Sequence, residues 1–211
     1  MGEKFNFLFV VDVSGSMYGQ KIASVNAALT ECLAAIKQIG FSGQYDINVS
    51  IATFAEKLHL QKVNQKPESI EALNIKVEPL EDGFYLVTSF ASLYRGLKYL
   101  FTKKTITDEQ QGKNTFIFLF SDAKPVDGKE YGDAFEEIQN CLEFKNANKY
   151  VGFVDEDSDK YNKDTIMFVD YKAEHIVRAS EISNEISKLQ MMYFSDFSSQ
   201  SDKDKYEQIF V

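Results

Sequence analysis

The residues best suited to chemistry follow the first apolar segment of the chain. Positions 5–11 are almost entirely apolar, and Asp12, Ser14 and Ser16 come directly after them at every second position. These three side chains offer only hard oxygen donors, which are the ligands that a hard divalent cation such as Mg²⁺ prefers. Gly15 allows the tight turn that would bring both hydroxyls to one point. The stretch therefore predicts a metal-binding loop.

Two distant segments offer further ligands to the same point. Positions 115–121 form another apolar run, which ends at Asp122. Thr88, with its neighbour Ser89, precedes a helical pattern. Asp12, Thr88 and Asp122 would then lie at strand ends or helix starts on one edge of a sheet, where ligands bind in open α/β folds. We therefore expect these side chains to converge, with Ser89 as the alternative to Thr88.

The hydrophobic spacing predicts strands that alternate with helices. Apolar or alternating runs predict strands over 5–11, 45–54, 57–63, 115–121, 150–154 and 166–169, the third as an edge hairpin. Three- and four-residue spacing predicts helices over 22–39, 90–101, 130–142 and 182–193, with a helical turn over 67–72 and a short strand or extended linker over 73–79. This alternation implies an α/β fold: a mostly parallel, doubly wound (Rossmann-like) sheet with helices on both faces and one short antiparallel edge strand.

The composition restricts the possible functions. A chain of 211 residues is expected to form one domain, assigned to 1–195, followed by a polar tail over 196–211 whose last apolar residues could dock. A formal net charge of −9 without a concentrated basic face argues against a nucleic-acid partner. Neither a leader nor an apolar run of about 18 residues occurs, which indicates a cytoplasmic protein without a membrane partner. Cys32 and Cys141 fall on the apolar sides of predicted helices and are expected to be buried free thiols.

The combined pattern resembles the metal-ion-dependent adhesion site of von Willebrand factor A (VWA) domains. It has Asp12, Ser14 and Ser16 after the first strand, Thr88 before a middle helix and Asp122 after a later strand. The wording VVDVSGSMYGQKI and SDAKPVDG is most similar to cytoplasmic bacterial VWA proteins of the tellurium-resistance type. The resemblance implies that Ser14, Ser16 and Thr88 ligate the metal directly, and that Asp12 and Asp122 act directly or through water.

Two places in the chain depart from the pattern of that family. Glycines usually precede the threonine, where this chain has Leu86 and Val87. A glycine usually follows the later acid, where this chain has Ala123. Both changes leave the ligand atoms in place but reduce the conformational freedom of the backbone.

The resemblance and the charge balance favour a non-enzymatic, Mg²⁺-dependent protein-interaction module. Two carboxylates neutralise Mg²⁺, and neutral hydroxyls and water leave one position that attracts an Asp or Glu of a protein partner. Mn²⁺ or Ca²⁺ could take the place of Mg²⁺. By analogy with the family, the partners would be proteins of a bacterial stress or defence system.

Two enzymatic or signalling alternatives fit these residues less well. A Mg²⁺-dependent phosphohydrolase on a similar sheet would need a second acid two positions after Asp12, where Ser14 stands. A receiver domain phosphorylated on aspartate would need an acidic pair with a middle-strand acid and a late lysine, which Asp12 and Asp122 do not form.

Other polar residues have structural interpretations. Ser16 could cap the following helix, and Asp127 with Glu130 resembles a capping box at the start of the helix over 130–142. A calcium loop that begins at Asp155 lacks the required glycine and glutamate. Both histidines, His59 and His175, are expected to be structural or exposed.

Overall fold

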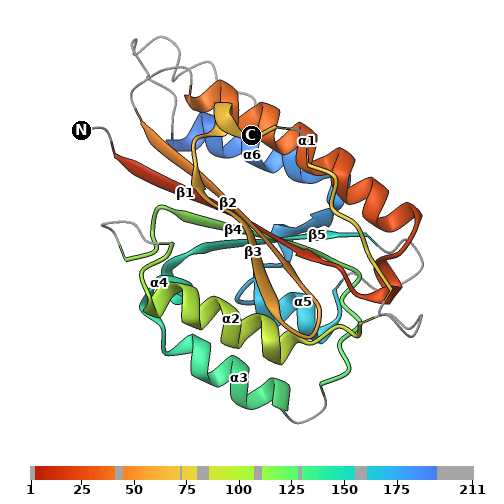
Figure 1. Ribbon diagram of the computed structural model, residues 1–211. Coiled ribbons are helices and arrows are strands. Elements are labelled where there is room, and N and C mark those ends of the chain that lie inside the picture. The colour runs from red at the N-terminus through yellow and green to blue at the C-terminus, as the bar shows by residue number, and fades with distance from the viewer. Residues whose placement is uncertain are drawn as a thin grey trace.

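A six-stranded sheet runs through the described part of the chain (Figure 1). The computed structural model describes residues 3–40, 45–71, 73–79, 86–106, 111–127, 130–154 and 161–193. The strands lie in the order β3-β2-β1-β4-β5-β6, and every neighbouring pair is parallel except β2 with β3. They are β1 (Lys4–Asp12), β2 (Asp46–Phe54), β3 (Leu58–Gln65), β4 (Thr115–Ser121), β5 (Asn148–Phe153) and β6 (Ile176–Arg178). The predicted α/β fold with one antiparallel edge strand is confirmed.

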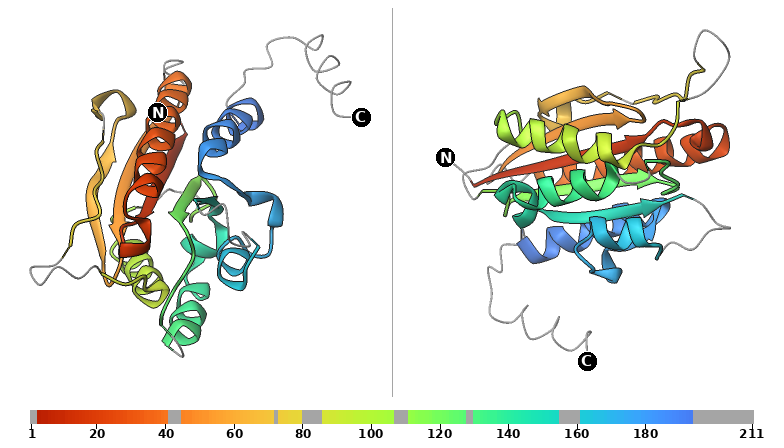
Figure 2. Two further views of the ribbon diagram at one scale, coloured as in Figure 1. Left: turned by 90° about the vertical axis from the view of Figure 1, so that its right-hand side faces the viewer. Right: turned by 90° about the horizontal axis from the view of Figure 1, so that it is seen from below.

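Helices cover both faces of the sheet, as Figures 1 and 2 show. One face carries α1 (Gln20–Gly40) and α6 (Ile182–Tyr193). The other carries α2 (Phe90–Thr102), α3 (Glu130–Gln139), α4 (Leu142–Asn146) and α5 (Lys163–Phe168). Short 3₁₀ turns connect these elements: η1 (Gly15–Met17), η2 (Pro67–Ser69), η3 (Ala173–His175) and η4 (Ala179–Glu181). The predicted helices over 22–39, 90–101 and 182–193 and the turn that begins at position 67 are confirmed.

Stacked phenylalanines join the two central strands. Alternate residues of β1 and β4 point toward α1 and α6, and their rings pack across the strand pair. Phe7 stacks on Phe116 at a centroid distance of 5.1 Å, and Phe9 stacks on Phe118 at 5.3 Å. Such cross-strand aromatic pairs add to the free energy gained by burial. The abundant aromatic residues therefore build the core, as the sequence predicts.

Residues 166–169 were expected to form a strand, and that prediction is wrong. They belong to α5 and to the residue that follows it. The Asn162 side chain accepts hydrogen bonds from the N–H groups of Asp164 and Thr165, both at 3.0 Å, and so caps the helix. The last strand is instead β6, which has only three residues. Residues 73–79 contain no strand.

The helix expected over 130–142 is interrupted before its end. α3 stops at Gln139 and α4 begins at Leu142, which is 54% exposed rather than buried. Cys32 is a buried free thiol, as predicted, but Cys141 lies at the break between the two helices and is only half-buried. Because the helical spacing does not persist through position 142, Leu142 faces solvent, whereas Cys141 remains partly buried against the core.

A buried lysine near the start of β5 bonds to the neighbouring segments. Lys149 is 2% exposed, and its ammonium donates to the carbonyls of Phe144 and Ala147 at 2.7 and 3.2 Å and to Asp170 at 2.7 Å. His175 donates from Nδ1 to the carbonyl of Lys149 at 2.8 Å. Burial lowers the pKa of both Lys149 and His175. These groups have structural roles, and His59 lies exposed on β3.

The acidic segment that begins at Asp155 and the tail over 196–211 lie outside the described residues. Within the described ranges, no helix has the length and apolarity needed to cross a lipid bilayer.

Candidate metal centre

The loop after β1 is folded by its own acid. Asp12 is fully buried, and its Oδ1 accepts a hydrogen bond from the backbone N–H of Ser14 at 2.9 Å. An aspartate that binds the N–H two residues ahead stabilises a tight turn. The chain then enters η1, and the Oγ atoms of Ser14 and Ser16 lie 3.2 Å apart. The sequence DVSGS thus forms a compact turn directly at the end of a buried strand.

Three segments far apart in the sequence meet at this turn. Thr88 Oγ1 lies 2.7 Å from Ser14 Oγ and donates to Asp12 Oδ2 at 3.4 Å. Ser16 Oγ donates to Asp122 Oδ1 at 3.1 Å. All five residues singled out in the sequence therefore belong to one hydrogen-bonded cluster. It lies at the carboxyl ends of β1 and β4, at the right-hand end of the sheet in Figure 1.

Backbone hydrogen bonds hold the three loops together. The N–H of Gly15 donates to the carbonyl of Leu86 at 2.9 Å, and the N–H of Val126 donates to the carbonyl of Thr88 at 3.1 Å. Only the backbone of Leu86 takes part in this contact, so the absence of a glycine there does not prevent it. Val87 is 46% exposed and points its side chain toward solvent.

Thr88 and Ser89 have different roles. Ser89 Oγ accepts a hydrogen bond from the N–H of Ser92 at 3.1 Å and thereby caps the start of α2. Thr88 is the residue that faces the cluster. Asp127 was expected to cap α3 together with Glu130; its carboxylate instead accepts from the N–H of Ala91, at 2.7 Å, in the first turn of α2.

Ser121 is a neighbour of the cluster that the sequence interpretation missed. Its hydroxyl donates to Asp12 Oδ2 at 2.7 Å and accepts from the N–H of Ala123 at 2.9 Å. Ala123 has the left-handed backbone angle φ +51°, which costs a residue with a side chain about 1–2 kcal/mol. The bond to Ser121 helps to hold that conformation. A hydroxyl at the end of an otherwise apolar strand was the available signal.

Asp122 forms ion pairs with two lysines. It is fully buried, and its Oδ2 accepts a hydrogen bond from Lys21 Nζ at 2.8 Å. A second ammonium, on Lys124, lies 3.9 Å from the same oxygen, but half of that side chain is exposed. Asp122 therefore differs from Asp12, whose carboxylate accepts hydrogen bonds from a backbone N–H group and from hydroxyls.

Burial makes the ionised form of Asp12 costly. It raises the pKa of the Asp12 carboxyl; hydrogen bonds from Ser14 and Ser121 oppose this shift, and the charge of Asp122 adds to it. No set of three or more His, Cys, Asp or Glu residues able to hold a metal ion occurs in the described residues. The cluster instead combines two carboxylates with three hydroxyls. This all-oxygen donor set fits a hard divalent cation, because such a cation would offset the two buried charges.

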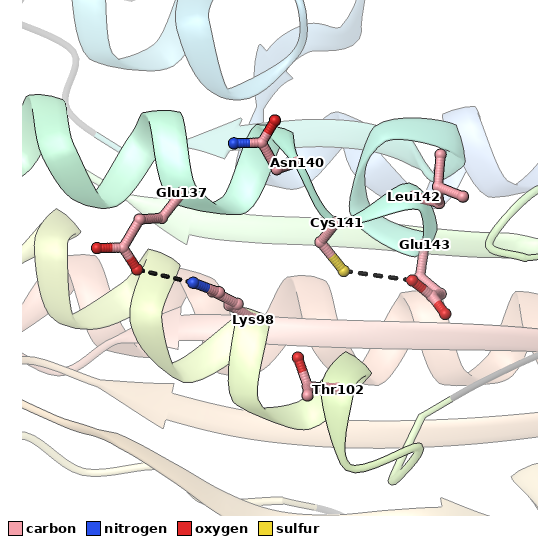
Figure 3. Close-up of a pocket in the computed structure, with 7 residues that line it drawn as sticks. All are labelled: Lys98, Thr102, Glu137, Asn140, Cys141, Leu142 and Glu143. Atoms are coloured by element: carbon pink, nitrogen blue, oxygen red, sulfur yellow. Dashed lines mark hydrogen bonds and ion pairs between the residues drawn. The ribbon is translucent and has the colours of Figure 1, made fainter.

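A separate groove of about 430 Å³ lies between α2, α3 and α4 (Figure 3). It is lined by the carboxyl-terminal parts of α2 and α3, by the connection between α3 and α4, and by the start of α4, whereas the polar cluster lies at the amino-terminal end of α2. Two pairs occupy its walls: Lys98 with Glu137 at 2.8 Å, and the Cys141 thiol, which donates to Glu143 at 3.3 Å. The groove is therefore not part of the polar cluster.

The chain matches a family model described as the von Willebrand factor type A domain over residues 6–196. Among curated proteins, no sequence matches the chain.

Several solved structures share the fold at low sequence identity. The manganese-loaded TRAP protein of Plasmodium vivax is 14% identical, with a TM-score of 0.58 over 89% of this chain and 72% of that one. The pilus adhesin SpaC of Lactobacillus rhamnosus GG, in an open conformation, is 12% identical, with a TM-score of 0.57 over 89% of this chain and 29% of that one. BatB of Bacteroides thetaiotaomicron is 14% identical, with a TM-score of 0.53 over 89% of this chain and 99% of that one.

Proposed function

The chain belongs to the von Willebrand factor type A domain family, and we propose that it is a non-enzymatic protein-interaction module whose binding site is completed by Mg²⁺. Asp12, Ser14, Ser16, Thr88 and Asp122 would hold the cation. The observation that carries this proposal is their convergence: hydrogen bonds link two buried carboxylates and three hydroxyls from three loops into one cluster. Mn²⁺ and Ca²⁺ satisfy the same donor chemistry.

The charges of these residues explain how the site would select a partner. Mg²⁺, when bound, would supply two positive charges among these side chains. Asp12 and Asp122 balance these charges, and Ser14, Ser16 and Thr88 add none. A carboxylate from outside is then the strongest available ligand for a remaining position. The partner group is therefore an Asp or Glu side chain on another protein.

Apolar side chains around the cluster support a protein partner. Tyr18, Val87 and Val126 are 62%, 46% and 63% exposed, and each lies in one of the three loops that build the site. Val126 is also bonded through its N–H to the carbonyl of Thr88. Apolar side chains that surround a charged centre are typical of protein interfaces, where a desolvated charge pair gains strength.

The biological setting is a further part of the proposal. The wording VVDVSGSMYGQKI resembles VWA proteins of the tellurium-resistance type, so we place the chain in the cytoplasm of a bacterium, with partners from a stress or defence system. Two of the structural neighbours are a manganese-loaded protein and an adhesin. They support metal use and interaction by analogy of fold.

Affinity capture tests the proposal. The immobilised chain is incubated with lysate of its native cells in Mg²⁺ or in chelator, and retained proteins are identified by mass spectrometry. We expect a defined set of proteins that Asp12→Ala fails to retain, while Asp133→Asn, an exposed acid on α3, retains it. Equal retention in Mg²⁺ and chelator would reject metal dependence. Metal-stimulated hydrolysis of a generic phosphoester would instead favour the phosphohydrolase alternative.

A further inference from the structure

One cation is held directly beside the buried acids. Lys21 Nζ lies 2.8 Å from Asp122 Oδ2, and 26% of the Lys21 side chain is exposed. The pair spans 101 residues of sequence, from the start of α1 to the end of β4. Asp12, by contrast, accepts hydrogen bonds from Ser14, Thr88 and Ser121, all neutral donors. The two acids of the cluster are therefore compensated unequally.

The place of Lys21 on its helix points to a role at the site. Lys21 is the second residue of α1, and the first turn of that helix contains no acidic residue. The amino terminus of a helix carries a partial positive charge and disfavours a cation. The helix itself therefore gives no reason for a lysine here, whereas the buried carboxylate of Asp122 does.

The formal charges of the cluster change sign when a divalent cation enters. Asp12 and Asp122 contribute two negative charges and Lys21 one positive charge, so the set carries −1 alone and +1 with the cation. Without Lys21, the same set would carry −2 alone and would be neutral with the cation. Lys124 is left out of this count because it is 3.9 Å from Asp122 and half exposed, where solvent screens its charge.

We propose that Lys21 sets the charge balance of the metal centre: it weakens binding of the divalent cation and strengthens binding of an anionic guest to the loaded site. The inference rests on the proposed function and deepens it. With Lys21 present, a guest carboxylate brings the loaded set to neutrality. Without it, the same carboxylate would leave a net negative charge. Lys21 is thus a positioning and specificity residue that acts through Asp122.

Manganese and acetate serve as probes of the two effects on the full chain. Free Mn²⁺ is measured by electron paramagnetic resonance, and acetate binding is followed by its effect on water-proton relaxation of the Mn²⁺-loaded protein. In Lys21→Gln we expect Mn²⁺ to bind about tenfold tighter or more, and acetate about threefold weaker or more. Lys21→Arg keeps the charge, and Lys124→Gln removes the screened one. In both control variants, the dissociation constants for Mn²⁺ and for acetate should stay within about threefold of the wild-type values.

Each outcome separates the role of Lys21 from the metal site itself. If the wild-type chain binds no Mn²⁺, both the proposed function and this inference are wrong. If the wild-type chain binds Mn²⁺ but Lys21→Gln binds it equally or more weakly, or binds acetate equally well, only the role of Lys21 is wrong. Circular dichroism monitors folding of the variant. A Lys21→Gln chain that unfolds without metal should refold with Mn²⁺, and failure to do so counts against the proposal.

Discussion

Asp12→Asn tests two effects of the buried Asp12 charge: the free energy that it costs without metal, and its contribution to metal binding. The asparagine carbonyl can still accept from the N–H of Ser14, which lies 2.9 Å from Asp12 Oδ1. The amide NH₂ would replace Oδ2 and could donate to Ser121 and Thr88, whose hydroxyls can turn to accept. The substitution therefore keeps the shape of the turn while removing one of two buried negative charges.

Two opposing effects set the stability of this variant without metal. Hydrogen bonds to a charged group contribute about 1.5–3 kcal/mol each, against about 0.5–1.5 kcal/mol for neutral pairs, so the asparagine loses hydrogen-bond energy. The substitution also removes the free-energy penalty of burying a desolvated carboxylate, and this gain in stability is of similar size. We therefore expect the free energy of unfolding in chelator to lie within about 1 kcal/mol of wild type.

Mg²⁺ should stabilise the wild-type chain but not Asp12→Asn. At a Mg²⁺ concentration one hundred times its dissociation constant, the wild-type chain gains about 2.7 kcal/mol. For a domain of this size that gain corresponds to a rise in melting temperature of about 5–11 °C. Asp12→Asn should show no rise, because the ligand set has lost one of its two charges.

Thermal unfolding followed by circular dichroism, in chelator and in Mg²⁺, measures this difference. Asp133→Asn is the matched control: it removes one negative charge from a chain whose net charge is −9, but from an exposed position on α3. It should keep the full response to Mg²⁺. The reasoning is refuted if Asp12→Asn responds to Mg²⁺ as strongly as wild type, or if Asp133→Asn loses the response.

Three further substitutions test the supporting structure by urea unfolding. Ser121→Ala removes the hydroxyl that donates to Asp12 at 2.7 Å and should lower the free energy of unfolding by about 1–2 kcal/mol; an unchanged value would remove Ser121 from the site. Lys149→Met leaves two carbonyls and Asp170 without their shared donor and should cost about 2–4 kcal/mol, discounted because Asp170 is one-third exposed. An unchanged free energy of unfolding would contradict the structural role of Lys149. Burial lowers the pKa of His175 below the ordinary 6.5, so the unfolded chain binds a proton first as the pH falls. Stability from this group is present above pH 6.5 and is lost as the pH falls through the folded pKa; His175→Gln should show a smaller loss between about pH 7.5 and 5.5, and an equal loss would contradict the assignment.

The parts of the fold that sequence could predict are those with a strong period. The alternation of Ile47, Val49 and Ile51 with polar residues in β2 and the three- and four-residue spacing of α1, α2 and α6 are repeated often enough to fix both element type and buried face. Four consecutive apolar residues at 166–169 carry no period, and a strand and a buried helical turn are then indistinguishable. The capping residue Asn162 was the better signal, because its side chain accepts from two N–H groups at the start of α5.

The candidate cluster was predictable for a different reason. Its loops follow strands or precede a helix at one edge of a parallel sheet, so topology alone brings Asp12, Thr88 and Asp122 together. Lys21 and Ser121 were missed because no periodic pattern marks them. Lys21 is one of several polar residues on α1, and Ser121 is the last residue of an apolar strand. Their roles depend on contacts with Asp122 and Asp12 that only the three-dimensional arrangement reveals.

The geometry of the cluster depends on the core beneath it. β1 and β4 are in parallel register, with Phe7 opposite Phe116 and Phe9 opposite Phe118, and the same pairs are stacked rings. A slip of β4 by one residue would turn Phe116 and Phe118 to the opposite face of the sheet, away from the rings of β1, so these aromatic contacts favour the observed register. The strands therefore end together, and the acid that closes β1 meets the hydroxyl that closes β4 at 2.7 Å. The stacked phenylalanines thus help to place Asp12 beside Ser121, and the loops that follow these strands complete the cluster.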